Sequence, residues 1–342
     1  MKAARIYEPG KPFQIDEVAK PEMKPGHALV KVKAAGVCGS ELDFVEGIFP
    51  FTPPFTLGHE IAGVIEEIDP EYEILAQVGD RVAVYNYMGC GVCRCCRDDK
   101  ENMCPNNKGQ FGFTVDGGFA EYVLVPVYNL VPIPDGVEFE EAAILACSGM
   151  TAMHSARRVN AQIGEYVAVN GVGGVGLMCI QTAKIRGNKV IAIADNEMRA
   201  ELAKSVGADF AIVETDYTKV PDKVRACTPG GEGIQAWFDL VGTTESYLAG
   251  IQSQRRGGKV CIIGYQPANN INFYPVDMMV KEGQIVSSVA GCKRDVELAL
   301  QYCAEGRIKV VVGARFKLED INEPINMLIN RTARGRSVII FD

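Results

Sequence analysis

The chain has 342 residues, enough for two ordinary domains, and 47% of them are hydrophobic. Its 35 basic and 43 acidic side chains give a formal net charge of -8, and no basic cluster of the kind that follows a nucleic acid backbone is present in the sequence. Because we find neither an export signal nor a run of about 18 apolar residues, we expect a cytoplasmic protein whose 12 cysteines are metal ligands or reduced thiols.

The first 150 residues predict a strand-rich, antiparallel domain. Short apolar alternations occupy residues 27 to 37 and 79 to 87, and a turn region rich in proline lies between them at residues 49 to 60. Such alternation is typical of strands that bury one face, and the prolines and glycines mark the turns that join them.

A cysteine-rich segment, CGVCRCCRDDKENMC, lies within this first domain at residues 90 to 104. Its four regularly spaced cysteines are Cys90, Cys93, Cys96 and Cys104. Four thiolates on a short loop can surround one ion, and the long last gap favours zinc over the [4Fe-4S] cluster that a C-x2-C-x2-C start also permits. We expect a structural zinc site, closed to substrate, in a lobe at about residues 86 to 107, with Cys95 as a free, exposed thiol.

From residue 151 to 288 the pattern changes to strand-like runs separated by helix-length segments. The runs occupy residues 165 to 170, 189 to 195, 209 to 213, 236 to 242, 258 to 264 and 284 to 289. This alternation predicts a doubly wound parallel sheet, an α/β Rossmann domain. Residues 289 to 342 hold two helical stretches and a closing strand; this tail is too short to fold alone, so we expect it to return to the first domain.

The loop after the first parallel strand carries the pattern Gly171-x-Gly173-x-x-Gly176. The first glycine permits a tight turn, the second lets the backbone approach a pyrophosphate, and the third lets helix and strand pack closely. The next strand ends in Asp195, whose carboxylate can accept hydrogen bonds from ribose hydroxyls and would repel an NADP 2′-phosphate. Arg199, one helical turn further on, softens that repulsion. We therefore predict a dinucleotide site that favours NAD(H) over NADP(H).

Three dispersed segments carry donors that a catalytic zinc would bind. They contain Cys38 in AAGVCGSELDF, His59 and Glu60 in LGHEIAG, and Cys147 in LACSGMT. No local spacing links these segments. Taken together with the cysteine-rich loop and the glycine pattern, however, GHE-x-x-G resembles the zinc-dependent medium-chain dehydrogenases, the alcohol dehydrogenase family, along essentially the whole chain. The resemblance implies a GroES-like fold for the strand-rich catalytic domain.

The resemblance also implies a catalytic zinc held by Cys38, His59 and Cys147, with a fourth position for water or the substrate oxygen. Glu60 would be an alternate ligand of that metal. With the structural site, this makes two Zn²⁺ ions per subunit. The implied reaction is that of an alcohol dehydrogenase, in which the metal lowers the pKa of a bound alcohol and hydride passes from its carbon to C4 of the nicotinamide.

Residues beside Cys38 match other parts of the family's site. Ser40 matches a hydroxyl that begins proton exit, and Glu41 matches a carboxylate that orients the ligand histidine. Asp43 stands where many members have a histidine, so either Asp43 passes the proton on or water does so directly. A second departure from the pattern, an apparent insertion near Asp69, is expected to alter only a surface turn.

Further cofactor contacts are implied by the same resemblance. Thr151 and Val175 would pack on the nicotinamide, Ile263 would lie beside its carboxamide, and Arg336 would pair with the pyrophosphate. Gly174 belongs to the glycine loop itself.

The substrate is the least specified part of the site. Asn86 falls where many alcohol-oxidising relatives place a large aromatic residue over the substrate, while several aromatic residues surround the motif segments. These are Phe44, Phe49, Phe51, Phe55 and Tyr85. An apolar pocket with a polar corner favours a cyclic, aromatic or otherwise functionalised alcohol. A hydroxyacyl-CoA or enoyl-CoA thioester and a polyol are alternatives.

Two other classes of protein are weighed against this interpretation. A zinc-free, quinone-reducing relative would lack the cysteine-rich loop and the ligand set, and a non-catalytic redox sensor would not need Cys38, Ser40, His59 and Cys147. Because relatives assemble by pairing edge strands of their nucleotide domains, we expect a homodimer or homotetramer, with residues 284 to 291 as the edge. Its substrate is a small molecule, and no nucleic acid or membrane partner is expected.

Overall fold

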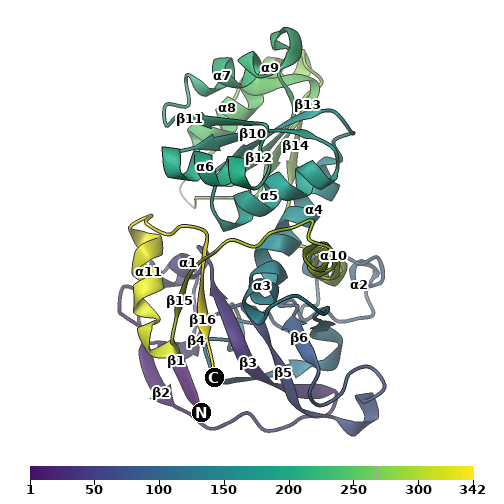
Figure 1. Ribbon diagram of the computed structural model, residues 1–342, viewed down its shortest axis with the longest axis vertical. Coiled ribbons are helices and arrows are strands. Elements are labelled where there is room, and N and C mark those ends of the chain that lie inside the picture. Colours follow the sequence, from purple (N-terminus) through teal and green to yellow (C-terminus); the bar gives the residue numbers. More distant parts are fainter. Residues whose placement is uncertain (267–268) are drawn as a thin grey trace. The chain divides into compact units, whose positions relative to one another are not determined.

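The chain forms two structural units in a computed structural model that describes residues 1 to 266 and 269 to 342 (Figure 1). Unit 1 comprises Met1–Met150, Cys292–Gly306 and Val310–Asp342, and unit 2 comprises Thr151–Gly291 and Arg307–Lys309. The divisions expected from the sequence were after residues 150 and 288. No helix of the described residues is long and apolar enough to cross a bilayer.

Unit 1 is built on a seven-stranded sheet around the long strand β3 (His27–Val37). The sheet order is β15-β16-β3-β5-β6-β8, and β7 also pairs with β3. The other strands are β5 (Glu60–Ile68), β6 (Arg81–Val84), β7 (Tyr122–Pro126), β8 (Leu130–Pro132), β15 (Val312–Phe316) and β16 (Arg336–Ile340). The pairs are antiparallel except that β15 and β16 run parallel. Because β16 pairs with β3, the C-terminal strand belongs to the same sheet as the strands from the first part of the chain.

Smaller elements surround this sheet in unit 1. A three-stranded sheet of order β2-β1-β4 consists of β1 (Lys2–Ile6), β2 (Gln14–Glu17) and β4 (Phe55–Thr56). The helices are α1 (Glu41–Val45), α2 (Arg94–Arg97), α3 (Phe139–Ile144), α10 (Lys293–Ala304) and α11 (Asn322–Ile329).

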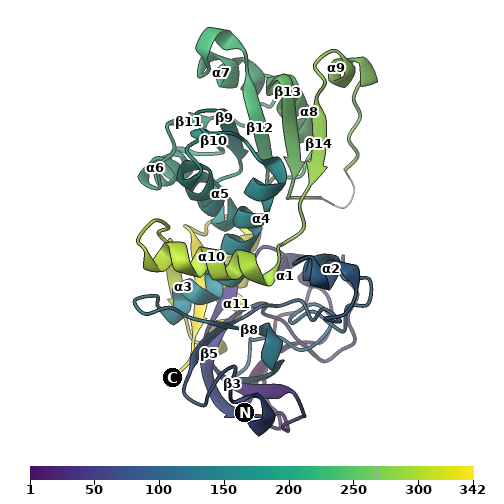
Figure 2. The same ribbon diagram turned by 90° about the vertical axis from the view of Figure 1, so that its right-hand side faces the viewer.

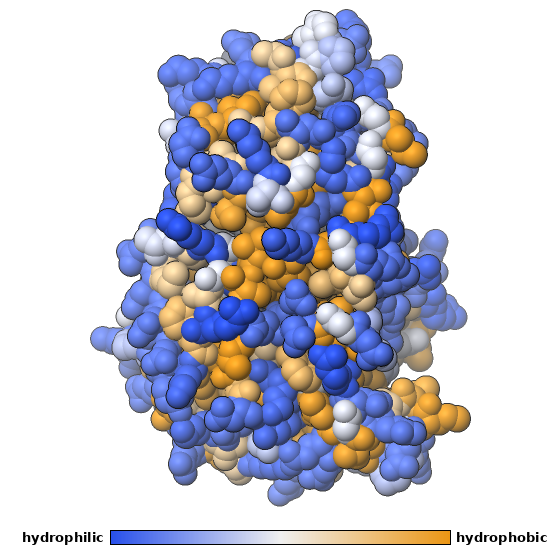
Figure 3. Space-filling model, in the orientation of Figure 1, coloured by the Kyte–Doolittle hydropathy of each residue, from blue (hydrophilic) through white to orange (hydrophobic). Residues whose placement is uncertain are grey.

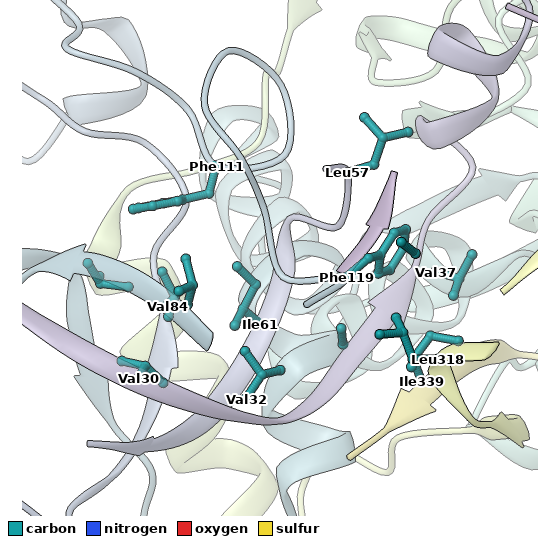
Figure 4. Packing of buried hydrophobic residues seen from close by; sticks show 14 of the residues in the cluster. Val30, Val32, Val37, Leu57, Ile61, Val84, Phe111, Phe119, Leu318 and Ile339 are labelled. Carbon is teal, nitrogen blue, oxygen red and sulfur yellow. The ribbon is translucent and has the colours of Figure 1, made fainter. Parts of the chain in front are cut away.

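The core of unit 1 joins side chains from distant parts of the sequence (Figure 4). Val30 and Val32 of β3 are fully buried, and they pack in one cluster with Ile61 of β5 and with Ile339 from the C-terminal strand. Burying a side chain of this size contributes roughly 1.5–3 kcal/mol. The closing strand is therefore part of the unit 1 core rather than an appendage.

The apparent insertion near Asp69 lies in the turn between β5 and β6. Asp69 accepts a hydrogen bond from the backbone N–H of Glu71 at 3.1 Å and so begins a short 3₁₀ turn. The loop beyond it exposes apolar side chains, including Ile74 (92% exposed) and Leu75 (66%), and Figure 3 shows such side chains gathered over this loop at the lower right margin. The predicted surface turn is thus present, and it is more apolar than a solvated turn requires.

Unit 2 contains a six-stranded parallel sheet of order β11-β10-β9-β12-β13-β14. Its strands are β9 (Tyr166–Asn170), β10 (Lys189–Ala194), β11 (Phe210–Val213), β12 (Ile234–Asp239), β13 (Gln254–Ile262) and β14 (Gln284–Ser287). Helices lie on both faces of the sheet (Figures 1 and 2), which confirms the predicted doubly wound fold. They are α4 (Met150–Val159), α5 (Gly174–Ile185), α6 (Glu197–Ser205), α7 (Val220–Ala226), α8 (Thr244–Ser253) and α9 (Pro275–Met279).

The strand order of unit 2 reverses at β9, which has β10 on one side and β12 on the other. In open α/β sheets, nucleotides bind beyond the carboxyl ends of the strands at such a switch point. The glycine loop follows β9 directly, so the fold presents that loop at the expected position.

Candidate active site and metal centres

Four potential metal donors meet in unit 1, although they come from three separate segments. Cys38 follows β3, and His59 and Glu60 lie at the start of β5, where Gly36 of β3 pairs with Glu60. Cys147 comes from the segment after α3. One donor atom from each of the four residues lies within 4.8 Å of the others, and His59 Nε2 is 3.3 Å from Cys147 Sγ. Strand pairing thus joins donors that no spacing in the sequence connects.

Cys147 lies on a π-helical turn, Leu145–Gly149, between α3 and α4. Such a turn accommodates one more residue than an α-helical turn and is frequent at functional sites. It presents Cys147 toward the other three donors.

Glu41 orients two of the donor residues at once. Its carboxylate accepts a hydrogen bond from the Cys38 backbone N–H at 2.8 Å through Oε2, and its Oε1 lies 3.0 Å from His59 Nδ1. Burial alone would lower the pKa of His59, but the charges of Glu41 and Cys38 outweigh it and raise that pKa well above its usual range. With Nδ1 held by Glu41, Nε2 is left for a metal. This is the role that the sequence implied for Glu41.

The donor atoms of the site are suited to a bound metal ion. The hydrogen bond with Cys147 and the Arg336 charge lower the pKa of the Cys38 thiol, which favours the thiolate that binds metal. Burial raises the pKa of Glu60 to about 8 against the opposing effect of Arg336. Arg336 lies 3.1 Å from Glu60 Oε1, yet neither buried oxygen of Glu60 has a well-oriented hydrogen bond from any described residue. Two sulfurs, an imidazole nitrogen and a carboxylate form a donor set that fits zinc.

Arg336 was expected to pair with the cofactor pyrophosphate. In the structure it opens β16 in unit 1, is only 6% exposed, and faces Glu60 as described above. Its guanidinium also lies 3.4 Å from the Val37 carbonyl oxygen. The residue therefore belongs to the surroundings of the metal site, a contact that the sequence analysis missed, while its role toward the cofactor stays a prediction.

The second cluster consists of the four cysteines of the predicted structural site. Their Sγ atoms are 3.6 Å apart for Cys93 and Cys96, 3.8 Å for Cys93 and Cys104, and 4.0 Å for Cys90 and Cys96. Sulfurs at the corners of a tetrahedron with Zn–S bonds of about 2.3 Å are about 3.8 Å apart. The separations thus fit one zinc ion.

The backbone of this lobe also supports the thiolates. The N–H groups of Cys93 and Cys96 point at the sulfurs of Cys90 and Cys93, at 3.3 and 3.5 Å. Cys95, on the short helix α2, lies outside the cluster as a free thiol, and it is half-buried rather than exposed as expected.

Aromatic side chains line one side of the catalytic cluster. The ring of Phe113 is centred 4.9 Å from the His59 ring and 6.2 Å from that of Phe49, which in turn packs 5.4 Å from Phe44. The sequence analysis missed Phe113. The sequence signal was the neighbouring Gly112. It has a φ of +71°, and a Cβ at this position would stand 2.8 Å from the Gly58 backbone, so this loop packs closely beside His59.

The other residues expected near the substrate lie in the same unit. Ser40 precedes α1, but its hydroxyl makes no capping bond to that helix. The half-buried Asp43 lies on α1 and accepts the backbone N–H groups of Ile48 and Phe49 through its carbonyl oxygen. Asn86 is 2% exposed, and its Oδ1 has no hydrogen-bond partner among the described residues.

The glycine loop of unit 2 has the geometry that its pattern predicts. Gly171 has φ of +98°, and a Cβ on Gly176 would lie 2.0 Å from the Gly171 carbonyl oxygen. A Cβ on Gly173 would meet nothing within 4 Å, so open space lies at the N-terminus of α5. Gly174 and Val175 are the first two residues of that helix. A pyrophosphate fits such a loop, because unpaired N–H groups of a helix N-terminus attract anions.

The remaining cofactor candidates also lie in unit 2. Asp195 follows β10, where Arg199 donates to its Oδ2 at 2.7 Å and the Asn196 side chain donates to its Oδ1 at 2.9 Å. Thr151 is buried on α4, and Ile263 follows β13 at intermediate exposure. Both oxygens of Asp195 are therefore held in place before any ribose binds.

Comparison with known proteins places these sites in a family. Residues 24–135 match the alcohol dehydrogenase GroES-like domain, and residues 174–335 match the zinc-binding dehydrogenase domain. An alcohol dehydrogenase of Geobacillus stearothermophilus is 35% identical over 345 aligned positions that cover 100% of both chains. The chain belongs to the zinc-dependent medium-chain alcohol dehydrogenase family.

Other family members agree with this assignment. An NAD-dependent alcohol dehydrogenase of Saccharolobus solfataricus is 33% identical over 99% of this chain and 100% of its own. The crystal structure of the alcohol dehydrogenase from the archaeon Aeropyrum pernix matches with a TM-score of 0.91 at 28% identity, over 100% of both chains. The resemblance and the GroES-like and Rossmann folds inferred from the sequence are thus confirmed.

Proposed function

We propose that this protein is a zinc-dependent oxidoreductase that transfers hydride between an alcohol and NAD. The convergence of donor atoms from Cys38, His59, Glu60 and Cys147 within 4.8 Å carries the proposal, together with relatives that are NAD-dependent alcohol dehydrogenases. When bound, zinc supplies a Lewis acid for the substrate oxygen and NAD supplies the hydride acceptor. Metal analysis of dialysed protein tests this proposal. If no tightly bound zinc remained, the result would favour a zinc-free, quinone-reducing activity instead.

The chain's own residues then have separate tasks at the metal. Cys38, His59 and Cys147 would hold the metal, and Glu41 keeps the His59 ring in place. Glu60, which faces Arg336, would be an alternate ligand. Three protein ligands would leave one position at a zinc ion for the substrate oxygen.

Ser40 and Asp43 form the proposed path for the substrate proton. The Ser40 hydroxyl is close in sequence to Cys38 and makes no capping bond to α1, so it is available to accept a hydrogen bond from the substrate hydroxyl. If Asp43 continues the path, Asp43→Asn slows proton release and shifts the pH profile of kcat. An unchanged profile assigns the step to water instead.

NAD is proposed to bind with its pyrophosphate at Gly171, Gly173 and Gly176 and its adenosine ribose at Asp195. The fixed orientation of the Asp195 carboxylate supports a preference for two ribose hydroxyls over a phosphate, and the Arg199 ion pair weakens that preference without reversing it. The ratio of kcat/KM for NAD to that for NADP measures this preference. Comparable values would reject it.

The aromatic side chains near His59 support a cyclic or aromatic alcohol as substrate. Phe113 lies beside His59 and packs against Phe49, and the buried Oδ1 of Asn86 offers an acceptor for a further polar group. NADH formation with a panel of cyclic alcohols, 1-phenylethanol, polyols and hydroxyacyl-CoA esters tests this choice. A higher kcat/KM for a polyol or a thioester would replace the aromatic assignment.

Phe113→Leu provides a sharper version of the same test. We expect it to lower kcat/KM for 1-phenylethanol by about tenfold, the size of a lost ring contact, while a short alcohol is affected much less. Phe316→Leu, a partly buried ring packed against the unit 1 core, is the control for loss of an aromatic elsewhere.

The proposed partner is a second copy of the chain. β14 is the last strand of the unit 2 sheet and pairs only with β13 in the described part of the chain. Near it, the segment of α9 exposes Tyr274 (77%), Val276 (51%) and Met279 (69%). An open strand edge beside exposed apolar side chains supports edge-to-edge pairing into a homodimer, or a homotetramer built from such dimers.

A further inference from the structure

A buried polar network joins three loops at the carboxyl ends of β9, β11 and β12. Its members are Asn170, the last residue of β9; Tyr217, in the loop after β11; and Trp237 and Asp239 of β12. None of them belongs to the cofactor contacts discussed above, yet Asn170 immediately precedes Gly171 of the glycine loop.

Asp239 is the fixed centre of this network. Its fully buried carboxylate accepts hydrogen bonds from the Trp237 indole N–H at 2.8 Å, from the Asn170 side chain at 3.3 Å, and from the backbone N–H groups of Val241 and Gly242 at 3.1 and 2.8 Å. A buried carboxylate with this many donors is held in one orientation. It therefore fixes the Asn170 amide as well as the turn after β12.

Tyr217 completes the network from the loop after β11. Its hydroxyl lies 3.2 Å from Asn170 Nδ2 and 3.3 Å from Asn170 Oδ1. The loop after β11 that carries Tyr217 is also bonded to the end of β10, because the Glu214 backbone N–H donates to the Ala194 carbonyl oxygen at 3.1 Å, next to Asp195. The charges of Asp239 and Asp195 contribute, after burial, to raising the pKa of Tyr217, which agrees with this position.

We propose that Tyr217 is a positioning residue for the adenosine half of the dinucleotide, because the loop that carries it is bonded both to Asn170, before the glycine loop, and to Ala194, before the Asp195 loop. One of these loops holds the pyrophosphate and the other the ribose, so their spacing determines how well both contacts form together. The inference rests on the proposed binding of NAD at these loops. Hydride transfer takes place at the nicotinamide end and does not depend on this spacing once the cofactor is bound.

Tyr217→Phe tests the inference, because it removes the hydroxyl and keeps the half-buried ring. We expect KM for NAD and the inhibition constant of ADP-ribose to rise by about 3- to 10-fold, while kcat stays the same. Tyr166→Phe is the matched control, since Tyr166 packs on the same core at the opposite end of β9. It should leave both constants unchanged.

A second variant separates positioning from a loss of folding. Asn170→Ala removes the other partner together with the bond from Asn170 to Asp239, so it should raise the ADP-ribose constant by at least as much. The double variant should show no more than the effect of Asn170→Ala alone, because the contact between Tyr217 and Asn170 is already lost. An inhibition constant within twofold of wild type for Tyr217→Phe, or fully additive effects in the double variant, would overturn the inference.

Direct binding distinguishes failure of this inference from failure of the proposed cofactor site. Trp237 is the one tryptophan of the chain and donates to Asp239, so its fluorescence reports energy transfer to bound NADH from within the network. If wild type shows no quenching by NADH and no inhibition by ADP-ribose, the proposed cofactor placement is wrong, and the inference is overturned with it. If wild type binds and Tyr217→Phe binds equally well, only the role of Tyr217 is rejected.

Discussion

Glu41 contacts two of the proposed metal donors without being one of them. Its two oxygens hold the Cys38 backbone and the His59 ring, so two donor residues share one support. Residues that hold metal ligands in this way typically change metal affinity by 10- to 100-fold when they are replaced.

We therefore expect Glu41→Gln to lower zinc affinity at the proposed catalytic site by about 10- to 100-fold, because the neutral amide removes the negative charge that faces the His59 ring at 3.0 Å. Zinc retained after dialysis against a graded chelator measures the effect. Glu46→Gln, an exposed change at the end of the same helix, is the control. Equal retention in the two variants would show that Glu41 serves folding alone.

Two glycines of the nucleotide loop should respond differently to the same added methyl group. Gly176→Ala places a Cβ 2.0 Å from the Gly171 oxygen and should destabilise unit 2 by roughly 1–3 kcal/mol. Gly173→Ala meets open space, so the protein should fold normally but bind NADH more weakly. Urea unfolding and NADH titration separate the two effects, and normal NADH affinity in Gly173→Ala would argue against a pyrophosphate at this loop.

At the scale of elements, the short helix of the cysteine lobe has no buried side chain to hold it. Helix α2 has four residues and no buried side chain, and the four sulfurs would repel one another as thiolates without a cation. The lobe is thus expected to lose its order when the ion is removed.

Cys104→Ser should reduce the zinc content from two ions per subunit to one and make residues 90 to 104 sensitive to protease. Cys95→Ser changes a neighbouring thiol that lies outside the cluster, so it should keep both ions. Metal analysis and limited proteolysis provide the readout. Brown protein absorbing near 400 nm would indicate an iron–sulfur cluster instead.

Elements with strong periodicity were predictable from the sequence. The alternation at residues 27 to 37 coincides with β3, and the strand-like run at residues 189 to 195 contains β10. Strand spacing and turn residues act locally, and so they are visible in one sequence.

Contacts made by pairing between distant segments were not predictable in the same way. Only the family resemblance joined Cys38 and Cys147 to His59, and it assigned Arg336 to the cofactor without revealing its contact with Glu60. The return of Arg307–Lys309 to unit 2 depends on Gln181, which accepts from the Lys309 N–H at 2.7 Å and donates to its carbonyl at 3.0 Å. A single buried amide leaves no periodic signal.

At the scale of the whole molecule, the exposed surface of unit 2 concerns the association of copies of the chain. The open edge of β14 and the apolar side chains of α9 would be solvated in a monomer, and an open strand edge invites pairing. A charge placed in this surface should oppose association.

Met279→Glu is therefore expected to convert the proposed oligomer to a monomer, or a tetramer to smaller species, as measured by light scattering after size-exclusion chromatography. Met103→Glu, at an exposed methionine of unit 1, is the matched change outside this surface. Unchanged mass in Met279→Glu would place the interface elsewhere.

The π-helical turn that carries Cys147 has a consequence for how this sequence can vary in length. Each residue of an α-helix turns the chain by about 100°, so deleting one residue from Leu145–Gly149 would rotate either the thiol or the whole of α4 away from its partners. The loop between β5 and β6 has no such constraint and already differs from the family's pattern. Natural insertions and deletions should thus be common in the loop and absent from Leu145–Gly149, so that a constant length of this turn becomes a marker of the proposed catalytic metal.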